Sequence, residues 1–316
     1  MCEYVFGPVL SSRLGKSLGV DLLGKNICSF DCLYCESGKT QIKTVKRAEY
    51  VTLERIIREL EEWFALGHEI PDHITLGGPG EPLLNARIGE IICSIKESWP
   101  EIPLAVLTNS SLLGSRKVRE QLRYADTVLP SLDSMVEEEF FRINRPHSQI
   151  RLRDIVRGIM DFKSSFEGRL CLEIMIIPGI NDSDENLKLV KDFCFELNPY
   201  RVDVTSMTRP GAYLDAAGMD ASLPEKWRTE FEPFSVDKPY KKSVKRKFRH
   251  HKLRSMIASS VQRRPQTSLQ LSQALEVNQD DLTDMLKQME QAKEIEPVKD
   301  SGNNKIFYKK RGKNAS

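Results

Sequence analysis

The chain has 316 residues, of which 40% are apolar and 29% charged, which is ordinary for a soluble globular protein. No run approaches the ~18–20 uninterrupted apolar residues of a membrane span, and the first residues lack the basic and apolar regions of a signal peptide. We therefore expect a cytoplasmic protein with no membrane contact. The formal net charge of +2 says little alone, because the basic residues are unevenly placed.

The seven cysteines include one tight group near the N-terminus. An odd total without a secretion signal argues against a disulfide framework. Cys28, Cys32 and Cys35 have the spacing C-x3-C-x2-C. A cubane of four irons usually takes four thiolates, so three thiolates leave one iron open to another ligand. Zinc is the main rival, but a structural zinc site needs four protein ligands, and Cys2 and His68 are not suitably spaced to complete one.

Helical and strand patterns then alternate from about residue 51 to residue 208. The expected helices are 51–66, 87–98, 115–124, 152–162 and 184–197, and the expected strands are 73–76, 104–108, 127–129, 170–177 and 202–206. Such alternation predicts a parallel sheet, open or closed into a barrel, with ligands at the C-terminal ends of the strands. The turn residues 77–81, 109, 131–133 and 178–181 all fall at these ends.

Regularity fades after Ala212. Residues 238–254 hold nine Lys or Arg residues and no acid, which is typical of a basic linker. Beyond it we expect helices at 253–261, 268–275 and 280–291, then a hairpin of strands 295–299 and 305–310. Three helices and a hairpin are the outline of a winged helix-turn-helix module. Such a module contacts nucleic acids, peptides or proteins, and the acidic start of the third helix fits poorly with DNA.

The cysteine motif, with Tyr34 just before its last cysteine, resembles the signature of the radical S-adenosylmethionine (SAM) enzymes. Residues 6–21 resemble the start of one subgroup, the Fe–S oxidoreductases related to wyosine-base (tRNA-modifying) enzymes. The resemblance covers almost the whole chain. It implies a [4Fe–4S] cluster on Cys28, Cys32 and Cys35 whose open iron binds SAM, and an external low-potential electron donor. Reductive cleavage of SAM would then release a 5′-deoxyadenosyl radical. The cofactors would carry out this chemistry, while the protein positions and shields them.

The same resemblance implies a SAM pocket. Residues 76–82 resemble the family's glycine-glycine-glutamate segment, which meets the methionine ammonium. The ends of the next two strands resemble positions that contact the ribose hydroxyls and the methionine carboxylate, and residues 176–182 resemble the adenine side. The cofactor-binding candidates are Tyr34, Gly78, Gly80, Glu81, Asn109, Ser131, Asp133, Ile177 and Asn181. Taken alone, most of these are ordinary turn and cap residues. No catalytic side chain is assigned.

We therefore predict an α/β chain with three parts. Residues 1–215 form an incomplete (β/α)6 TIM-like barrel, residues 216–252 a basic linker, and residues 253–316 a small winged-helix-like domain. The predicted function is reductive cleavage of SAM for hydrogen abstraction from a substrate, with tRNA or another RNA as one candidate. Two alternatives stay open: radical modification of a peptide or protein bound through the winged-helix module, and an Fe–S redox-sensing regulator that binds nucleic acid. A sensor, however, needs no SAM pocket.

Overall fold

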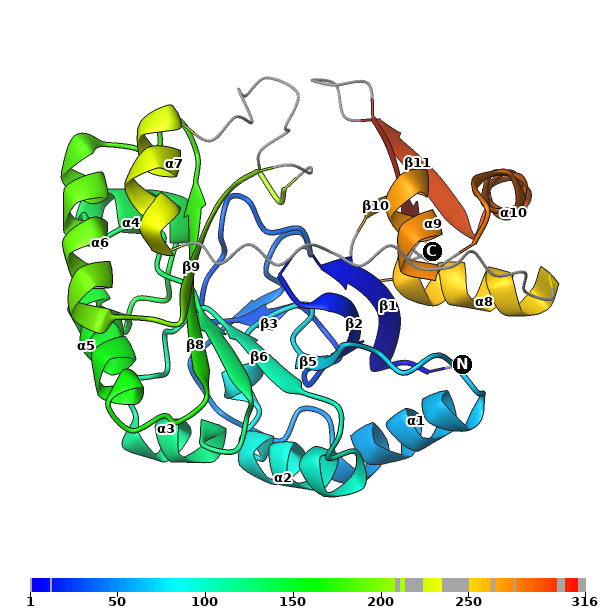
Figure 1. Ribbon diagram of the computed structural model, residues 1–316, viewed down its shortest axis with the longest axis horizontal. Coiled ribbons are helices and arrows are strands. Elements are labelled where there is room, and N and C mark those ends of the chain that lie inside the picture. The colour runs from blue at the N-terminus through cyan, green and yellow to red at the C-terminus, as the bar shows by residue number, and fades with distance from the viewer. Residues whose placement is uncertain are drawn as a thin grey trace.

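A curved seven-stranded sheet lies at the centre of the molecule, with helices on its outer face (Figure 1). The computed structural model describes residues 2–11, 13–207, 211–213, 224–234, 250–262, 265–275, 277–299 and 305–311. Among these residues, no helix is both long and apolar enough to span a membrane.

Six strands of this sheet are parallel and one is antiparallel. In spatial order the strands are β1 (Val5–Ser11), β2 (Gly15–Val20), β5 (His73–Leu76), β6 (Leu104–Thr108), β7 (Thr127–Pro130), β8 (Arg169–Ile176) and β9 (Arg201–Ser206). Every neighbouring pair from β2 to β9 is parallel. Strand β1 forms an antiparallel hairpin with β2 at the edge. The curled parallel sheet is a partial TIM-like barrel, which confirms this part of the prediction.

The outer layer consists of the helices that connect the strands. They are α1 (Leu53–Ala65), α2 (Ile88–Ser98), α3 (Arg116–Leu122), α4 (Glu137–Asn144), α5 (Leu152–Lys163), α6 (Asp184–Leu197) and α7 (Glu225–Phe231), with the short 3-10 helices η1 (Pro82–Leu84) and η3 (Glu232–Phe234). Side-chain caps fix two of the starts. Thr52 accepts a hydrogen bond from Arg55 N at the start of α1, and Ser183 accepts one from Asn186 N at the start of α6.

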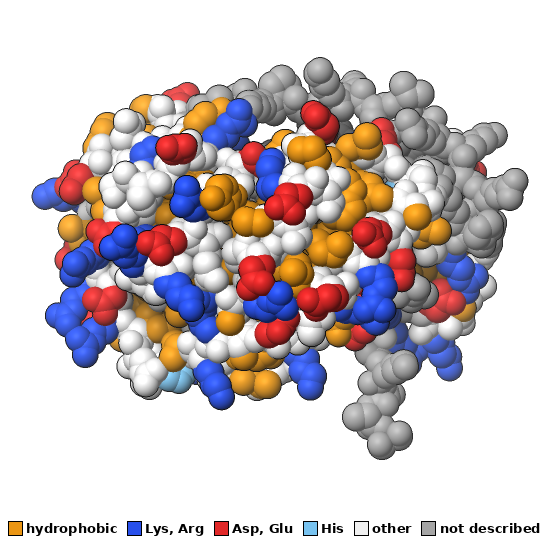
Figure 2. Space-filling model, turned by 90° about the horizontal axis from the view of Figure 1, so that it is seen from below, with side chains coloured by type: hydrophobic (Ala, Val, Ile, Leu, Met, Phe, Trp, Pro, Cys, Tyr) orange, Lys and Arg blue, Asp and Glu red, His pale blue; other side chains and the backbone are white. Residues whose placement is uncertain are grey.

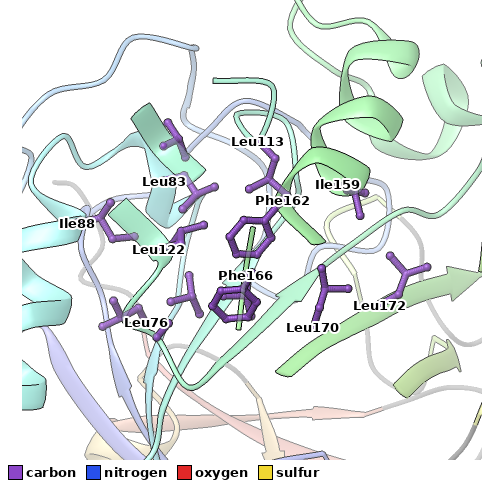
Figure 3. Packing of buried hydrophobic residues seen from close by; sticks show 14 of the residues in the cluster. Leu76, Leu83, Ile88, Leu113, Leu122, Ile159, Phe162, Phe166, Leu170 and Leu172 are labelled. Atoms are coloured by element: carbon purple, nitrogen blue, oxygen red, sulfur yellow. The ribbon is translucent and has the colours of Figure 1, made fainter. Parts of the chain in front are cut away.

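The main core fills the space between the sheet and these helices. Alternate residues of each strand point outward into it, as Ile74 and Leu76 of β5 do, and both are fully buried. In Figure 3, Phe162 of α5 and Phe166 lie beside each other, and their ring centroids are 4.6 Å apart. Leu170 of β8 packs in the same cluster. The core therefore fixes α5 and its neighbours against the sheet.

The structure contains elements that the sequence did not predict. The β1–β2 hairpin was missed because glycines and Pro8 interrupt its apolar alternation. Helix α4 was missed because it has only eight residues and begins with three glutamates. A further pair of two-residue strands, β3 (Ile27–Cys28) and β4 (Ile42–Lys43), also carries no sequence signal. Two of these additions, α4 and the β3–β4 pair, border the cysteine motif.

The tip of the β1–β2 hairpin closes the end of the barrel where the strands begin. Leu14 packs against Ala105, Leu129 and Cys171 inside the barrel. Beside it, Arg13 forms an ion pair with Glu173 of β8. The open end of the barrel is therefore the end where the parallel strands finish, which is where ligands bind in such folds.

The C-terminal residues form a separate core against strand β1. The elements are α8 (His250–Ser260), β10 (Gln266–Thr267), α9 (Ser268–Leu275), α10 (Gln279–Gln291), β11 (Ile295–Lys299) and β12 (Ile306–Lys310), and the strands pair in the order β10-β12-β11. Gly7 N donates a hydrogen bond to Ser259 Oγ, and Ser260 Oγ donates one to Pro8 O. The module thereby covers the outer edge of β1, an edge that would otherwise be open to aggregation.

The expected basic linker lies largely outside the described residues. Its described parts are residues 224–234, which contain α7 and η3, and residues 250–252, which begin α8. Trp227 and Phe231 of α7 are buried in the main core. This segment therefore packs with the barrel.

Candidate functional site

The three clustered cysteines lie on a loop at the open end of the barrel, which we call the cysteine loop (residues 27–35). Backbone hydrogen bonds hold the loop on two sides. Ile27 O accepts from Glu81 N at 3.0 Å, and Leu33 N donates to Ile143 O at 2.9 Å. Gly80 adopts a φ of +95° and packs so closely that a Cβ there would lie 2.0 Å from Ile27 O. Only glycine fits this contact.

Two amide side chains donate to the thiols. Asn109 Nδ2, at the end of β6, lies 3.4 Å from Cys28 Sγ. Asn144 is the last residue of α4, and its Nδ2 lies 3.5 Å from Cys32 Sγ. Donors aimed at sulfur tune the thiolates of iron–sulfur sites. Asn144 also has a buried Oδ1 with no hydrogen-bond partner among the described residues, so the polar groups around the thiols are not fully satisfied within the protein.

Burial controls the charge of these thiols. Burial, with a smaller contribution from the nearby Glu81 carboxyl, raises the pKa of Cys28 to about 12. Burial likewise raises the pKa of Cys32 well above its usual range, with added effects from Cys28 and Asp133. The pKa of Cys35 is also raised by burial. Thiols in such surroundings are protonated until a metal cation replaces their protons.

The donor set suits a cluster better than a single ion. Among the described residues, no three His, Cys, Asp or Glu side chains converge on a point that could hold one metal ion. A [4Fe–4S] cluster places each thiolate on a different iron, so its ligands do not need to converge. Three neighbouring thiols with amide donors to two of their sulfurs fit a cluster that keeps one iron free for another ligand.

Asp133 is the centre of a buried network behind the cysteine loop. Its Oδ2 accepts from the Tyr34 hydroxyl at 2.6 Å and from Asn144 Nδ2 at 2.6 Å. Its Oδ1 accepts from Met175 N at 2.9 Å. Burial raises the Asp133 pKa, and the hydrogen bonds from Tyr34 and Asn144 oppose that rise. A small cavity of about 10 Å³, room for one water molecule, lies beside Tyr34, Asn109 and Asp133.

Glu81 is a second buried carboxylate below the loop. It accepts hydrogen bonds from Leu83 N at 3.0 Å, Thr108 Oγ1 at 2.8 Å and Asn109 N at 2.7 Å. Burial raises its pKa to about 7, against the opposing effect of these hydrogen bonds. The carboxylate thus joins the start of η1 to the end of β6, and positions the residue that contacts Cys28.

The other candidates divide into buried and accessible residues. Ile177 and Asn181 are fully buried, and Asn181 Nδ2 donates to the carbonyls of Asp133 and Met175 at 2.7 and 2.8 Å. Gly78 is exposed with a φ of +149°, and Ser131 is partly exposed beside the small cavity. The structure therefore brings all the candidates to the open end of the barrel, in two layers of different depth.

Three basic residues that could have met an anionic ligand are paired within the protein. Arg13 pairs with Glu173, and Lys16 Nζ lies 2.9 Å from Glu69 Oε2. Arg145 lies 3.3 Å from Asp31 Oδ2. A fourth, residue 209, lies outside the described residues.

Sequence reasoning missed two residues that contact the cysteine loop. Asn144 connects Cys32 to Asp133 but stands before an Arg-Pro pair at the end of an unpredicted helix. Tyr213 donates from its backbone N to Leu33 O at 3.1 Å and from its hydroxyl to Asp31 Oδ2 at 2.8 Å. Neither residue belongs to a spaced motif, so no pattern in the sequence could have identified it.

Comparison with known proteins agrees with this geometry. Residues 24–190 match the model of the Radical SAM superfamily. The chain is 38% identical over 211 residues to a UPF0026 protein of Helicobacter pylori, covering 66% of this chain and 68% of that protein. It is 36% identical over 228 residues to a protein named GTPase Obg of Brachyspira hyodysenteriae, covering 72% of this chain but 33% of that protein.

A solved structure shares the fold. A radical SAM methyltransferase from Sphaerobacter thermophilus superposes with a TM-score of 0.52 at 16% identity, covering 70% of this chain and 64% of that chain. The relation to wyosine-base enzymes stays a prediction. Because the family model spans more than half of the sequence, this chain belongs to the radical SAM superfamily, whose members are iron–sulfur enzymes that bind a [4Fe–4S] cluster and SAM.

Proposed function

We propose that Cys28, Cys32 and Cys35 are the cluster ligands and that SAM binds beside them at the open end of the barrel. The observation that carries this proposal is the set of three thiols on one anchored loop, with Asn109 and Asn144 donating to two of the sulfurs. When bound there, the cluster and SAM would supply a 5′-deoxyadenosyl radical for hydrogen abstraction from the substrate.

The other candidate residues have two kinds of role, according to how deeply they are buried. We assign contact with SAM to the accessible candidates Gly78, Asn109 and Ser131. The other candidates hold the site in shape: Gly80 seats the cysteine loop, Glu81 positions Asn109, and the pair Tyr34–Asp133 fixes the loop from behind. Ile177 and Asn181 support the adenine side from below, because Asn181 fixes the backbone of Asp133 and Met175.

The test is anaerobic reconstitution with iron and sulfide, followed by reduction in the presence of SAM. The wild-type chain should bind about four irons and form 5′-deoxyadenosine. Cys28→Ala, Cys32→Ala and Cys35→Ala should each lose the product and most of the iron. Cys93→Ala is the matched control, because Cys93 is partly exposed on α2 and outside the site. Full iron loading of any of the three variants, or no product from the wild type, would contradict the proposal.

The C-terminal residues support a second, finer proposal. We propose that these residues form a winged helix, a proposal supported by the order α8-β10-α9-α10-β11-β12 and by a separate apolar core. The exposed side of α10 carries Asp280, Asp281 and Asp284, which repel phosphate. Among the described C-terminal residues we therefore assign RNA contact to β12, where Lys309 and Lys310 are exposed and Lys309 pairs with Glu296. RNA that copurifies with the chain and leaves in a high-salt wash would favour an RNA substrate over a peptide.

A further inference from the structure

A basic surface lies directly over the cysteine loop. The chain after Cys35 turns back so that β4 pairs with β3, and Lys43 stands opposite Cys28 in this register. Paired strands are only about 4.8 Å apart. Any molecule that touches Lys43 and its exposed neighbour Ile42 is therefore separated from the Cys28 backbone by one strand.

Three cations gather at this surface around one aromatic ring. The Arg145 guanidinium lies 4.0 Å from the centre of the Tyr213 ring, and Lys39 Nζ lies 4.7 Å from it. Lys43 Nζ donates to Arg145 O at 3.2 Å, which brings the third cation to the same place. These contacts define a cysteine-loop patch made of Lys39, Ile42, Lys43, Arg145 and Tyr213.

Two acids lie near the patch and reduce its charge, and one of the three cations, Arg145, is paired with the first of them. Asp31 is buried and accepts from Arg145 and the Tyr213 hydroxyl. Glu36 directly follows the cysteine loop and raises the pKa of Cys35, after the larger effect of burial. Against Asp31 and Glu36, the three cations of the patch leave one positive charge in excess. On the face shown in Figure 2, by contrast, Lys and Arg alternate with Asp and Glu.

Apolar surface lies among these cations. Ile42 is 47% exposed and the Tyr213 ring 38% exposed. Aromatic and arginine side chains are enriched at protein interfaces, while the charged surroundings steer a partner of opposite sign. A phosphate backbone would use the cations but gain little from the exposed isoleucine. The composition therefore favours an acidic protein over RNA.

We propose that the cysteine-loop patch is the docking surface for a small acidic electron-transfer protein. In this complex the partner loses one electron and the cluster gains it. Redox partners form small, weak interfaces of less than about 1,200 Å². A patch of five residues is large enough to form the centre of such an interface. The inference rests on the proposed function, because it needs a cluster on the cysteine loop.

The probe is an acidic [2Fe–2S] ferredoxin, and the variant is Lys39→Glu/Lys43→Glu. The control is Lys117→Glu/Lys188→Glu, which makes the same charge change on exposed positions of α3 and α6. At low ionic strength the patch variant should bind ferredoxin at least about tenfold more weakly than the wild type, and the difference should shrink towards 1 M salt. The control variant should bind like the wild type. Formation of 5′-deoxyadenosine driven by dithionite should stay the same in both variants, because this small reductant needs no docking surface.

Three results would overturn the inference. They are equal ferredoxin binding by the patch variant and the control, an equal loss of the ferredoxin-driven and dithionite-driven reactions in the patch variant, and tRNA binding at the patch that excludes ferredoxin. Failure of the proposed function is distinguishable, since it would appear as no dithionite-driven product in the wild type while ferredoxin binding is still measured.

Discussion

Substitution of Gly80 tests how the barrel shapes the cysteine loop. Gly80→Ala places a methyl group at a φ of +95°, which costs about 1–2 kcal/mol for a residue other than glycine. The new Cβ would also lie 2.0 Å from Ile27 O and 2.7 Å from Leu23 Cδ1, so the backbone beside Cys28 must move. That movement breaks the 3.0 Å hydrogen bond from Glu81 N to Ile27 O, at a further cost of about 1 kcal/mol.

Gly38 provides the matched control. It also has a positive φ, +83°, but a Cβ there would meet nothing within 4 Å. Gly38→Ala should therefore pay only the backbone strain of about 1–2 kcal/mol, whereas Gly80→Ala should lose at least about 2–3 kcal/mol. Urea unfolding of the iron-free protein measures both values. Iron bound after reconstitution should fall for Gly80→Ala and stay near the wild-type amount for Gly38→Ala. Equal losses of stability, or full iron loading of Gly80→Ala, would refute the reasoning.

Three other substitutions probe buried polar groups. The Glu59 carboxylate of α1 accepts hydrogen bonds from the backbone N–H groups of Glu3, Tyr4 and Val5 at 2.7–3.2 Å. Glu59→Ala should therefore lower the free energy of unfolding in urea by about 3 kcal/mol. The control Glu61→Ala changes an exposed residue and should lower it little. Asn181→Ala removes three hydrogen bonds, two of them fully buried, and should also lower the free energy of unfolding by about 3 kcal/mol. Ser183→Ala removes only the α6 cap and should lower it by about 1 kcal/mol, so similar values for the two variants would contradict this reasoning. Burial raises the pKa of Glu81 from 4.5 to about 7. The contribution of the protonated Glu81 carboxyl to the free energy of unfolding is therefore fully present below pH 4.5 and is lost as the pH rises through 7. The stability of the iron-free wild type relative to Glu81→Gln should therefore fall between pH 4.5 and 7, and a constant difference would show that the carboxyl is not perturbed.

Local periodicity was enough to predict most of the barrel. Strands 73–76 and 104–108 and helix 184–197 have the predicted bounds, because their apolar residues follow strand or helical spacing closely. Short elements without repeats were not predictable. The β3–β4 pair has two residues in each strand and exists only because the chain after Cys35 returns to the cysteine loop.

Motif position placed the candidate residues at the strand ends but did not give their orientation. The structure has Glu81 and Asp133 at the open end of the barrel. Motif position could not show that both carboxylates turn inward to accept hydrogen bonds from the protein, because this depends on partners such as Thr108 and Asn144 that are distant in sequence. The contribution of Tyr213 depends on contacts with a loop about 180 positions earlier, beyond the reach of any local pattern.

That separation has a consequence for biogenesis. Leu33 leaves the ribosome long before Tyr213, the residue that donates to its carbonyl. At ~5–20 residues per second, the 180 residues between them take roughly 9–36 s to synthesise. During this interval the nascent cysteine loop lacks its contact with Tyr213, and its three thiols precede most of the barrel that later buries them. An iron–sulfur assembly factor acting on the growing chain therefore has a period of open access that ends when the final contacts of the barrel form.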